Sequence, residues 1–135
     1  MNSFSWPVRI YYEDTDGGGV VYHANYLKFF ERARTEWLRS LGCEQTELRS
    51  REGVLFVVRT VQIKYARPAR FNQLLDVVTH VVELGRSRIV FDQKLQYGDD
   101  ILTAATVEVA CVASSSFKPV PIPAMLRQHF ESKQS

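Results

Sequence analysis

Hydrophobic and polar residues are spaced differently in different parts of the chain. From about His23 to Leu41, apolar residues return every three or four positions, which predicts one long helix with a broad buried face. The residues of that face are Tyr26, Phe30, Ala33, Trp37 and Leu41. Gly42 follows directly and predicts the end of the helix. A face this wide indicates that other elements pack around most of the helix.

Strand patterns flank this helix on both sides. The short stretch before it alternates, with Val8, Ile10 and Tyr12 on one face. Arg9 and Tyr11 lie on the other face. The segments after it are rich in Val, Ile, Phe and Thr, which is typical of strands. The five predicted strands are Trp6–Tyr12, Leu55–Tyr65, Leu74–Leu84, Arg86–Tyr97 and Ile101–Ala113.

Short linkers connect the last three strands, which favours antiparallel hairpins because parallel crossovers need a dozen or more residues. Gly85 forms one linker and Gly98-Asp99-Asp100 the other. Two shorter helices are predicted at Glu44–Arg51 and Ile122–Glu131. Residues 1–135 are therefore predicted to be a single α+β domain, a five-stranded antiparallel sheet wrapped around the long helix. The remaining sheet face and edges favour a homo-oligomer.

Composition excludes several classes of protein. The chain is 45% hydrophobic and 24% charged, as globular domains are, and no apolar run approaches the roughly 20 residues that span a bilayer. The N-terminus lacks the pattern of a secretory signal, so a cytoplasmic location is expected. A net charge of +2 argues against nucleic-acid binding. Cys43 and Cys111 lack metal or disulfide spacing, and we expect two reduced, packed thiols.

The segment from Tyr11 to His23 is the strongest candidate for a functional site. It joins two aspartates, three consecutive glycines, a tyrosine and a histidine directly before the long helix. Ordering a glycine loop is entropically costly and usually serves unusual dihedrals or the close approach of a ligand. The helix start should present unbonded N–H groups and a partial positive charge, which would stabilise a developing anion. Asp16 would then face that anion.

Other site types fit this segment poorly. The glycines lack the G-x-G-x-x-G spacing of a dinucleotide fold and the Lys-Ser or Lys-Thr of a P-loop. A calcium loop starting at Asp14 would place Asn25 where a bidentate Glu belongs. His80 and His129 show no zinc-ligand spacing, and the chain has no Gly-x-Ser-x-Gly elbow.

Each side chain of the segment also has a purely structural interpretation. Asp14 and Asp16 can be turn residues that bond their own backbone. Glu13 can point to solvent or form an ion pair. His23 can cap the helix, and Tyr22 can be a core aromatic residue. Residue types alone do not decide between these interpretations and a catalytic one.

The motif over residues 12–26, Tyr-Glu-Asp-Thr-Asp-x-Gly-Gly-Val-Val-Tyr-His-x-x-Tyr, resembles a known family. With Phe-Glu-Arg-Ala-Arg-Thr-Glu at residues 30–36, it is similar to hotdog-fold acyl-CoA thioesterases of the 4-hydroxybenzoyl-CoA thioesterase type, closest to the Tol-Pal-associated subgroup. The similarity continues through Phe56-Val57-Val58-Arg59, Tyr65-x-x-Pro68-Ala69-Arg70 and Lys118-Pro119. It therefore covers almost the entire chain.

The resemblance implies hydrolysis of acyl-CoA thioesters without a metal or redox cofactor. The family's catalytic carboxylate falls on Asp16, which acts as nucleophile or as general base toward water. Backbone N–H groups near His23 are implied as oxyanion donors, and the His23 side chain as a catalytic group that positions substrate or water. Gly17 stands where relatives often have Ala or Pro, which should loosen the loop.

The resemblance also implies a substrate-binding set between two subunits. Its members are Tyr22, Gly19, Arg59, Thr60 and Lys118. Further candidates for the coenzyme A phosphates are Arg67, Arg70, Arg86 and Arg88, although a surface ion pair is the more common explanation for each of them. Lys118 is the first choice among the phosphate candidates.

The implied partners are an acyl-CoA, an acyl carrier protein as another thioester donor, and copies of the same chain in a dimer of dimers. Two other functions stay open at this stage. One is a hotdog hydratase or dehydratase, which the intact Asp-Thr-Asp motif at residues 14–16 opposes. The other is a non-catalytic module that binds an acyl carrier or an envelope-biogenesis partner, for which Asp16 would not be required.

Overall fold

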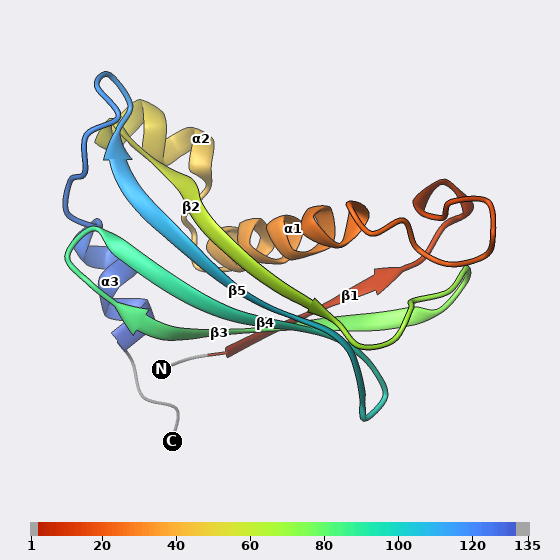
Figure 1. The fold of residues 1–135 in the computed structure, drawn as a ribbon. Helices are drawn as coiled ribbons and strands as arrows, with labels where there is room; N and C mark the ends of the chain where they lie inside the picture. The colour runs from red at the N-terminus through yellow and green to blue at the C-terminus, as the bar shows by residue number, and fades with distance from the viewer. Residues whose placement is uncertain (1–2, 132–135) are drawn as a thin grey trace.

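A computed structural model describes residues 3–131 of the chain. Its helices and strands occur in the predicted order, one strand, one long helix and four strands, with short helices between and after them (Figure 1). The strands are β1 (Ser3–Arg9), β2 (Val54–Tyr65), β3 (Leu74–Leu84), β4 (Arg88–Tyr97) and β5 (Asp100–Ala113). The α-helices are α1 (Asn25–Ser40), α2 (Gln45–Glu47) and α3 (Ala124–Glu131). Residues 1–2 and 132–135 of the predicted domain lie outside the described part.

The five strands form one antiparallel sheet in the order β1-β3-β4-β5-β2. The sheet curves, and α1 lies across its concave face (Figure 1). This arrangement confirms the predicted five-stranded sheet around one long helix. The two edge strands are β1 and β2.

The core lies between α1 and the concave face of the sheet because the apolar residues of both face each other there. Trp37 of α1 illustrates the packing. Its ring stacks on Phe4 with centroids 5.9 Å apart and meets Phe91 and Phe130 edge-on at 6.2 and 5.1 Å. Phe130 belongs to α3, so the last helix closes the same core. Burial of these large side chains supplies most of the stability of such a domain.

The predicted first strand is wrong at its C-terminal end. The chain leaves the sheet after Arg9 and forms a short 3₁₀ helix at Tyr12–Asp14. Tyr12, predicted to share a face with Val8 and Ile10, is 69% exposed, whereas the other two are buried. The period-2 pattern continued by chance into a turn that Asp14 stabilises: its carboxylate accepts the N–H of Tyr11 at 2.8 Å.

Other boundaries moved by a few residues for local reasons. The long helix begins at Asn25 and not at His23, because the Asn25 N–H closes a turn onto the carbonyl of Tyr22 at 2.9 Å. Gly42 ends the helix as predicted, with a φ of +77°. The strand predicted to begin at Arg86 begins at Arg88, because the Gly85 N–H bonds the Arg88 carbonyl at 2.7 Å in a tight turn.

The two short predicted helices are present with altered bounds. The segment predicted at Glu44–Arg51 is one turn of α-helix followed by a π-helical turn at Leu48–Glu52. The last helix starts at Ala124 and not at Ile122, because the residue before a proline, here Pro123, avoids helical dihedrals.

Candidate active site

The glycine loop between β1 and α1 is fixed to the rest of the protein by backbone contacts. Thr15 and Val21 pair across the loop as an antiparallel bridge, and Val20 pairs with Arg70 of the segment between β2 and β3. The carbonyl of Gly19 accepts the N–H of Phe71 at 3.0 Å. The loop therefore has a defined conformation and is held against the start of β3.

Two of the three glycines occupy conformations that other residues rarely adopt. Gly17 has a φ of +91° and Gly19 a φ of +88°, both in the region that favours glycine. Gly18 is different, because a Cβ on it would lie 3.1 Å from Oδ1 of Asp16. The glycines thus permit the turn at two positions and leave room for the Asp16 carboxylate at the third.

The two aspartates make different contacts. Asp14 is a structural residue: Oδ2 bonds the Tyr11 N–H, and its carbonyl accepts the N–H of Tyr22 at 3.0 Å and Nδ2 of Asn25 at 2.8 Å. Asp16 is exposed, and among the residues that the structure describes only the Gly18 N–H bonds its carboxylate, at Oδ1 and 2.8 Å. Within residues 3–131 no cation lies within 4.0 Å of Asp16. Its second oxygen is therefore available to a substrate or a water.

Backbone donors lie at the start of α1, in the turn that follows the loop. Among the described residues, no acceptor is recorded for the N–H groups of His23 and Ala24. Such groups at a helix N-terminus carry partial positive charge. The Asn25 side chain ties this turn to the carbonyl of Asp14, so the donors and the aspartate loop are held to each other. The arrangement combines an available carboxylate with oriented N–H groups.

Aromatic side chains surround the same helix start. The rings of Tyr22 and His23 lie 4.6 Å apart, and Tyr65, at the end of β2, meets His23 edge-on at 6.5 Å. The hydroxyl of Tyr65 donates to the carbonyl of His23 at 3.1 Å. Tyr26 lies beneath, buried, and its hydroxyl accepts the N–H of Ala69 at 3.0 Å. Burial raises the pKa of Tyr26, so this hydroxyl stays neutral.

Tyr65 and Asn25 were not predicted as site residues. Asn25 lies inside the quoted motif, and a side chain able to cap a turn was the available signal. Tyr65 begins another segment that carries the family resemblance, but its contact with His23 joins residues 42 positions apart. A contact between residues so far apart cannot be inferred from the residue spacing in one sequence.

Several predicted substrate-binding residues lie elsewhere in the chain. Arg59 and Thr60 are exposed on edge strand β2, at an irregularity in its pairing with β5. Lys118 follows β5 in the loop leading to α3, at the end of the molecule opposite the glycine loop (Figure 1). One copy of the chain therefore groups Asp16, Gly19, Tyr22 and His23, but not these three.

The predicted phosphate-binding arginines differ in what holds them. Arg67 pairs with Asp100 at 3.4 Å, and Arg88 bonds Glu83, so both fit the surface ion-pair interpretation. Arg70 bridges Val20 of the site loop through its backbone, and no partner of its guanidinium is recorded among the described residues. Arg70 is therefore the arginine of this set that is best placed beside the loop.

Similarity to known proteins agrees with this architecture. Residues 18–104 match a family model described as the thioesterase superfamily. The "Acyl-CoA thioesterase YbgC" of Haemophilus influenzae is 50% identical over 129 residues, which cover 96% of this chain and 95% of that protein. The chain belongs to the thioesterase superfamily. The "Acyl-CoA thioester hydrolase YbgC" of Escherichia coli O6:H1 is 43% identical over 95% of this chain and 96% of its own length.

Solved structures of thioesterases have the same fold. A probable thioesterase from Bartonella henselae superimposes with a TM-score of 0.85 at 40% identity, covering 90% of this chain and all of that one. A 1,4-dihydroxy-2-naphthoyl-CoA thioesterase from Synechocystis gives 0.88 at 23% identity, covering 96% of each chain, which supports the fold alone. The thioesterase resemblance and the hotdog fold, both predicted from the sequence, are confirmed.

None of the helices within residues 3–131 is long and apolar enough to cross a membrane. Within the same range, no three His, Cys, Asp or Glu side chains are grouped as a metal site would require.

Proposed function

We propose that this thioesterase hydrolyses acyl-CoA thioesters at the loop between β1 and α1, with Asp16 as the catalytic carboxylate. One observation carries the proposal: Asp16 has a free carboxylate oxygen, while unbonded N–H groups lie at the start of the adjoining helix. The acyl-CoA names of relatives at 43–50% identity support the choice of substrate.

The reaction needs a nucleophile and a place for negative charge. Asp16 supplies the first, either by attacking the thioester carbonyl to form an anhydride that water then cleaves, or by deprotonating the attacking water. The N–H groups of His23 and Ala24 supply the second, because charge develops on the carbonyl oxygen as the carbon becomes tetrahedral. In the nucleophilic route the C–S bond breaks as the anhydride forms, before water cleaves it, and in the general-base route it breaks after water has added. In both routes the thiolate ends with a proton that comes from the water, and the products are a carboxylic acid and coenzyme A.

Neighbouring groups would position the thioester. Gly19 lacks a side chain and lets the substrate approach the backbone. The exposed rings of Tyr22 and His23 form one wall. The hydroxyl of Tyr65 holds the carbonyl of His23, which fixes the direction of the Ala24 N–H because both belong to one planar peptide unit. We assign His23 to the positioning of substrate or water. Arg70 is our first candidate for a phosphate of coenzyme A within the same chain.

A second copy of the chain would complete the site. Edge strand β1 contains Pro7, which has no N–H to offer, whereas the sequence of β2 has no proline. The concave face of β2 also exposes Val58 (48%) and Val61 (38%). We infer that two copies pair through β2 and that this brings Arg59, Thr60 and the more distant Lys118 toward the partner's loop. A dimer of such dimers is the assembly that we propose.

The proposal is tested by measuring thiol release from coenzyme A thioesters with short, long and aromatic acyl groups. Turnover of at least one acyl group, with a rate that saturates with substrate, is the expected result. An acyl carrier protein thioester forms a parallel arm and shows whether the carrier matters. Binding of both thioesters without any hydrolysis would contradict the proposal and would support a non-catalytic acyl-binding module.

A further inference from the structure

A cavity of about 150 Å³ lies between the middle of α1 and the strands β2, β4 and β5. Most of its wall is apolar, formed by side chains such as Phe56, Val58 and Phe91. Three polar residues of α1, Glu31, Arg34 and Thr35, also line it. An engineered cavity of similar volume holds one benzene molecule, so a group of about six carbon atoms fits this space.

Arg34 is held in this cavity by a buried amide. Its Nη1 donates to Oε1 of Gln93 at 2.8 Å. Gln93 is fully buried, and its Nε2 donates to the carbonyl of Phe30 and to Oγ1 of Thr79, both at 3.0 Å. Both N–H groups of the Gln93 amide donate to partners in the core, so its Oε1 points toward Arg34. The guanidinium is therefore positioned by the core of the protein.

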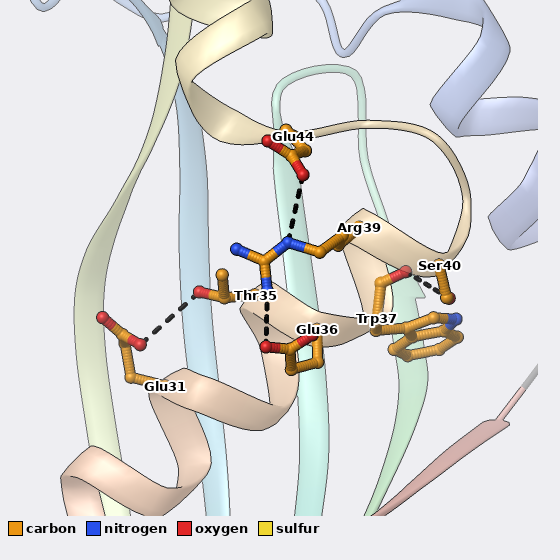
Figure 2. A network of polar contacts seen from close by, with 7 residues as sticks. All are labelled: Glu31, Thr35, Glu36, Trp37, Arg39, Ser40 and Glu44. Carbon is orange, nitrogen blue, oxygen red and sulfur yellow. Dashed lines mark hydrogen bonds and ion pairs between the residues drawn. The ribbon is translucent and has the colours of Figure 1, made fainter.

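Within residues 3–131, Arg34 forms no ion pair, although Glu31 lies near enough to raise the pKa of its guanidinium and so to oppose part of the effect of burial. No Asp or Glu oxygen of the described residues lies within 4.0 Å of this guanidinium. Arg39 on the same helix shows the usual case, with Glu36 at 2.5 Å and Glu44 at 3.1 Å (Figure 2). Burial lowers the pKa of Arg34 to about 10, which still leaves it protonated at neutral pH. One recorded bond uses one of its five N–H groups.

Glu31 supplies the complementary acceptor. Its Oε2 accepts the hydroxyl of Thr35 at 3.4 Å, one helical turn away (Figure 2). The carboxylate is exposed and otherwise without a recorded hydrogen bond among the described residues. One positive donor and one negative acceptor therefore border a small apolar space. A hydroxyl group, which both accepts and donates, satisfies this pair, whereas a carboxylate would meet the charge of Glu31.

We propose that this cavity is the acyl subsite of the enzyme and that Arg34, held by Gln93, makes it selective for acyl groups of about six carbons that carry a hydroxyl at the far end. This inference rests on the proposed function, because the acyl chain must enter from an Asp16 site. Val58 of the cavity directly precedes Arg59 and Thr60, which we place toward the partner's loop. The partner's Asp16 would then lie beside the cavity mouth.

The test compares matched thioesters: butyryl-, hexanoyl- and octanoyl-CoA, each with its ω-hydroxylated counterpart, and hexanoyl-CoA also with an ω-carboxylated one. The native protein is expected to show a kcat/KM at least about 10-fold higher for one hydroxylated thioester than for its plain partner, as a hydrogen bond to a charged group provides. In Arg34→Met, which keeps the apolar stem, this ratio should fall to about 1. Arg34→Lys should restore part of it.

Arg39→Met is the matched control, because it removes a guanidinium from the exposed side of the same helix. It should keep the native ratio. If Arg34→Met only destabilised the protein, kcat/KM would fall equally for both thioesters of a pair and their ratio would not change. The ratio therefore separates an effect on selectivity from an effect on stability. If Arg34→Met does not fold, Glu31→Gln provides the second variant, and its ratio should also fall.

Three results would overturn the assignment: equal rates for both members of every pair in the native protein, a preference for the carboxylated thioester, or an unchanged ratio in the Arg34→Met or Glu31→Gln protein. Failure of the native protein to hydrolyse any thioester is a different outcome. It would refute the proposed function, and the acyl subsite with it.

Discussion

Two aspartates, two residues apart and with the same chemistry, have different roles because their hydrogen bonds differ. Asp14 uses its carboxylate and its carbonyl to hold Tyr11, Tyr22 and Asn25 in place. Asp16 uses one oxygen to close its own turn and presents the other. Sequence alone left both interpretations open for both residues. The family resemblance selected Asp16, and the contacts of Asp14 independently explain why that residue is needed for structure.

Residues whose partners are near in sequence were predictable, and residues with distant partners were not. The glycine turn and Asp16 form one short segment, so their pattern was visible. Tyr65 meets His23, and Arg34 meets Gln93, only because strands from the second half of the chain fold over α1. The mismatch at Tyr12 has a different, local origin, since an exposed turn residue satisfied a strand pattern by chance.

The two cysteines should be unreactive in the folded protein. Both are buried, and burial raises the pKa of Cys43 and raises that of Cys111 to about 11. A raised pKa means that less thiolate is present at pH 8, for Cys111 about one molecule in a thousand. We expect no labelling by an aromatic disulfide reagent within minutes at pH 8, and two thiols per chain after denaturation. Rapid labelling of one thiol per chain in the native protein would contradict this.

At the scale of elements, the site is a junction of a strand, a glycine loop and a helix. The periodicity of each element was strong enough to predict its existence, and only the boundaries moved. The boundaries moved where a single hydrogen bond determines the first residue of an element, as at Asn25 and Arg88. Those bonds place the unbonded N–H groups of His23 and Ala24 just outside the helix. The position of the helix start therefore decides which N–H groups are available to the proposed oxyanion.

The glycines should separate stability from activity. Gly19→Ala places a residue with a Cβ at a φ of +88° and should lower the free energy of unfolding by roughly 1–2 kcal/mol. This loss would be measured as a lower denaturant concentration at the unfolding midpoint. Gly85→Ala is the matched control, because its Cβ would meet Arg88 at an ordinary 3.6 Å and the midpoint should hardly change. Equal midpoints for the two variants would contradict the loop conformation.

Gly18→Ala should act on the chemistry. Its added Cβ would lie 3.1 Å from Oδ1 of Asp16, so the carboxylate must shift by a few tenths of an ångström. We expect kcat to fall by about 10-fold, with a denaturant midpoint close to that of the native protein, because misplacement of a reacting group is costly. Native kcat in a folded Gly18→Ala protein would show that this contact is unimportant.

At the scale of the whole molecule, the two sheet edges are not equivalent. Pro7 interrupts the donors of β1, while β2 contains no proline and lies beside exposed apolar residues. The antiparallel sheet and its wrapping around α1 followed from element order and turn lengths. The edge that we propose to pair with another copy could not be predicted in this way, because the choice depends on side chains along a surface. The cytoplasmic location and the tetramer stay predictions.

A charge on the concave face of β2 should break the assembly. Val61→Asp would bury a carboxylate in the proposed interface, which is strongly unfavourable, so sedimentation should show monomers where the native protein shows an oligomer. Activity per chain should fall with it, because we propose that two copies complete each site. Val82→Asp is the control: Val82 is 53% exposed on β3, whose two edges are both paired. An oligomer that survives Val61→Asp would contradict pairing through β2.

The most direct test of the whole mechanism compares Asp16→Asn with Glu13→Gln. Both substitutions remove one carboxylate from an exposed position of the same segment, but only Asp16 lies at the proposed reaction centre. With the best acyl-CoA and folded protein, kcat should fall by at least about 100-fold in Asp16→Asn and stay near native in Glu13→Gln. Equal activity of the two variants, or a native kcat in Asp16→Asn, would contradict catalysis by Asp16.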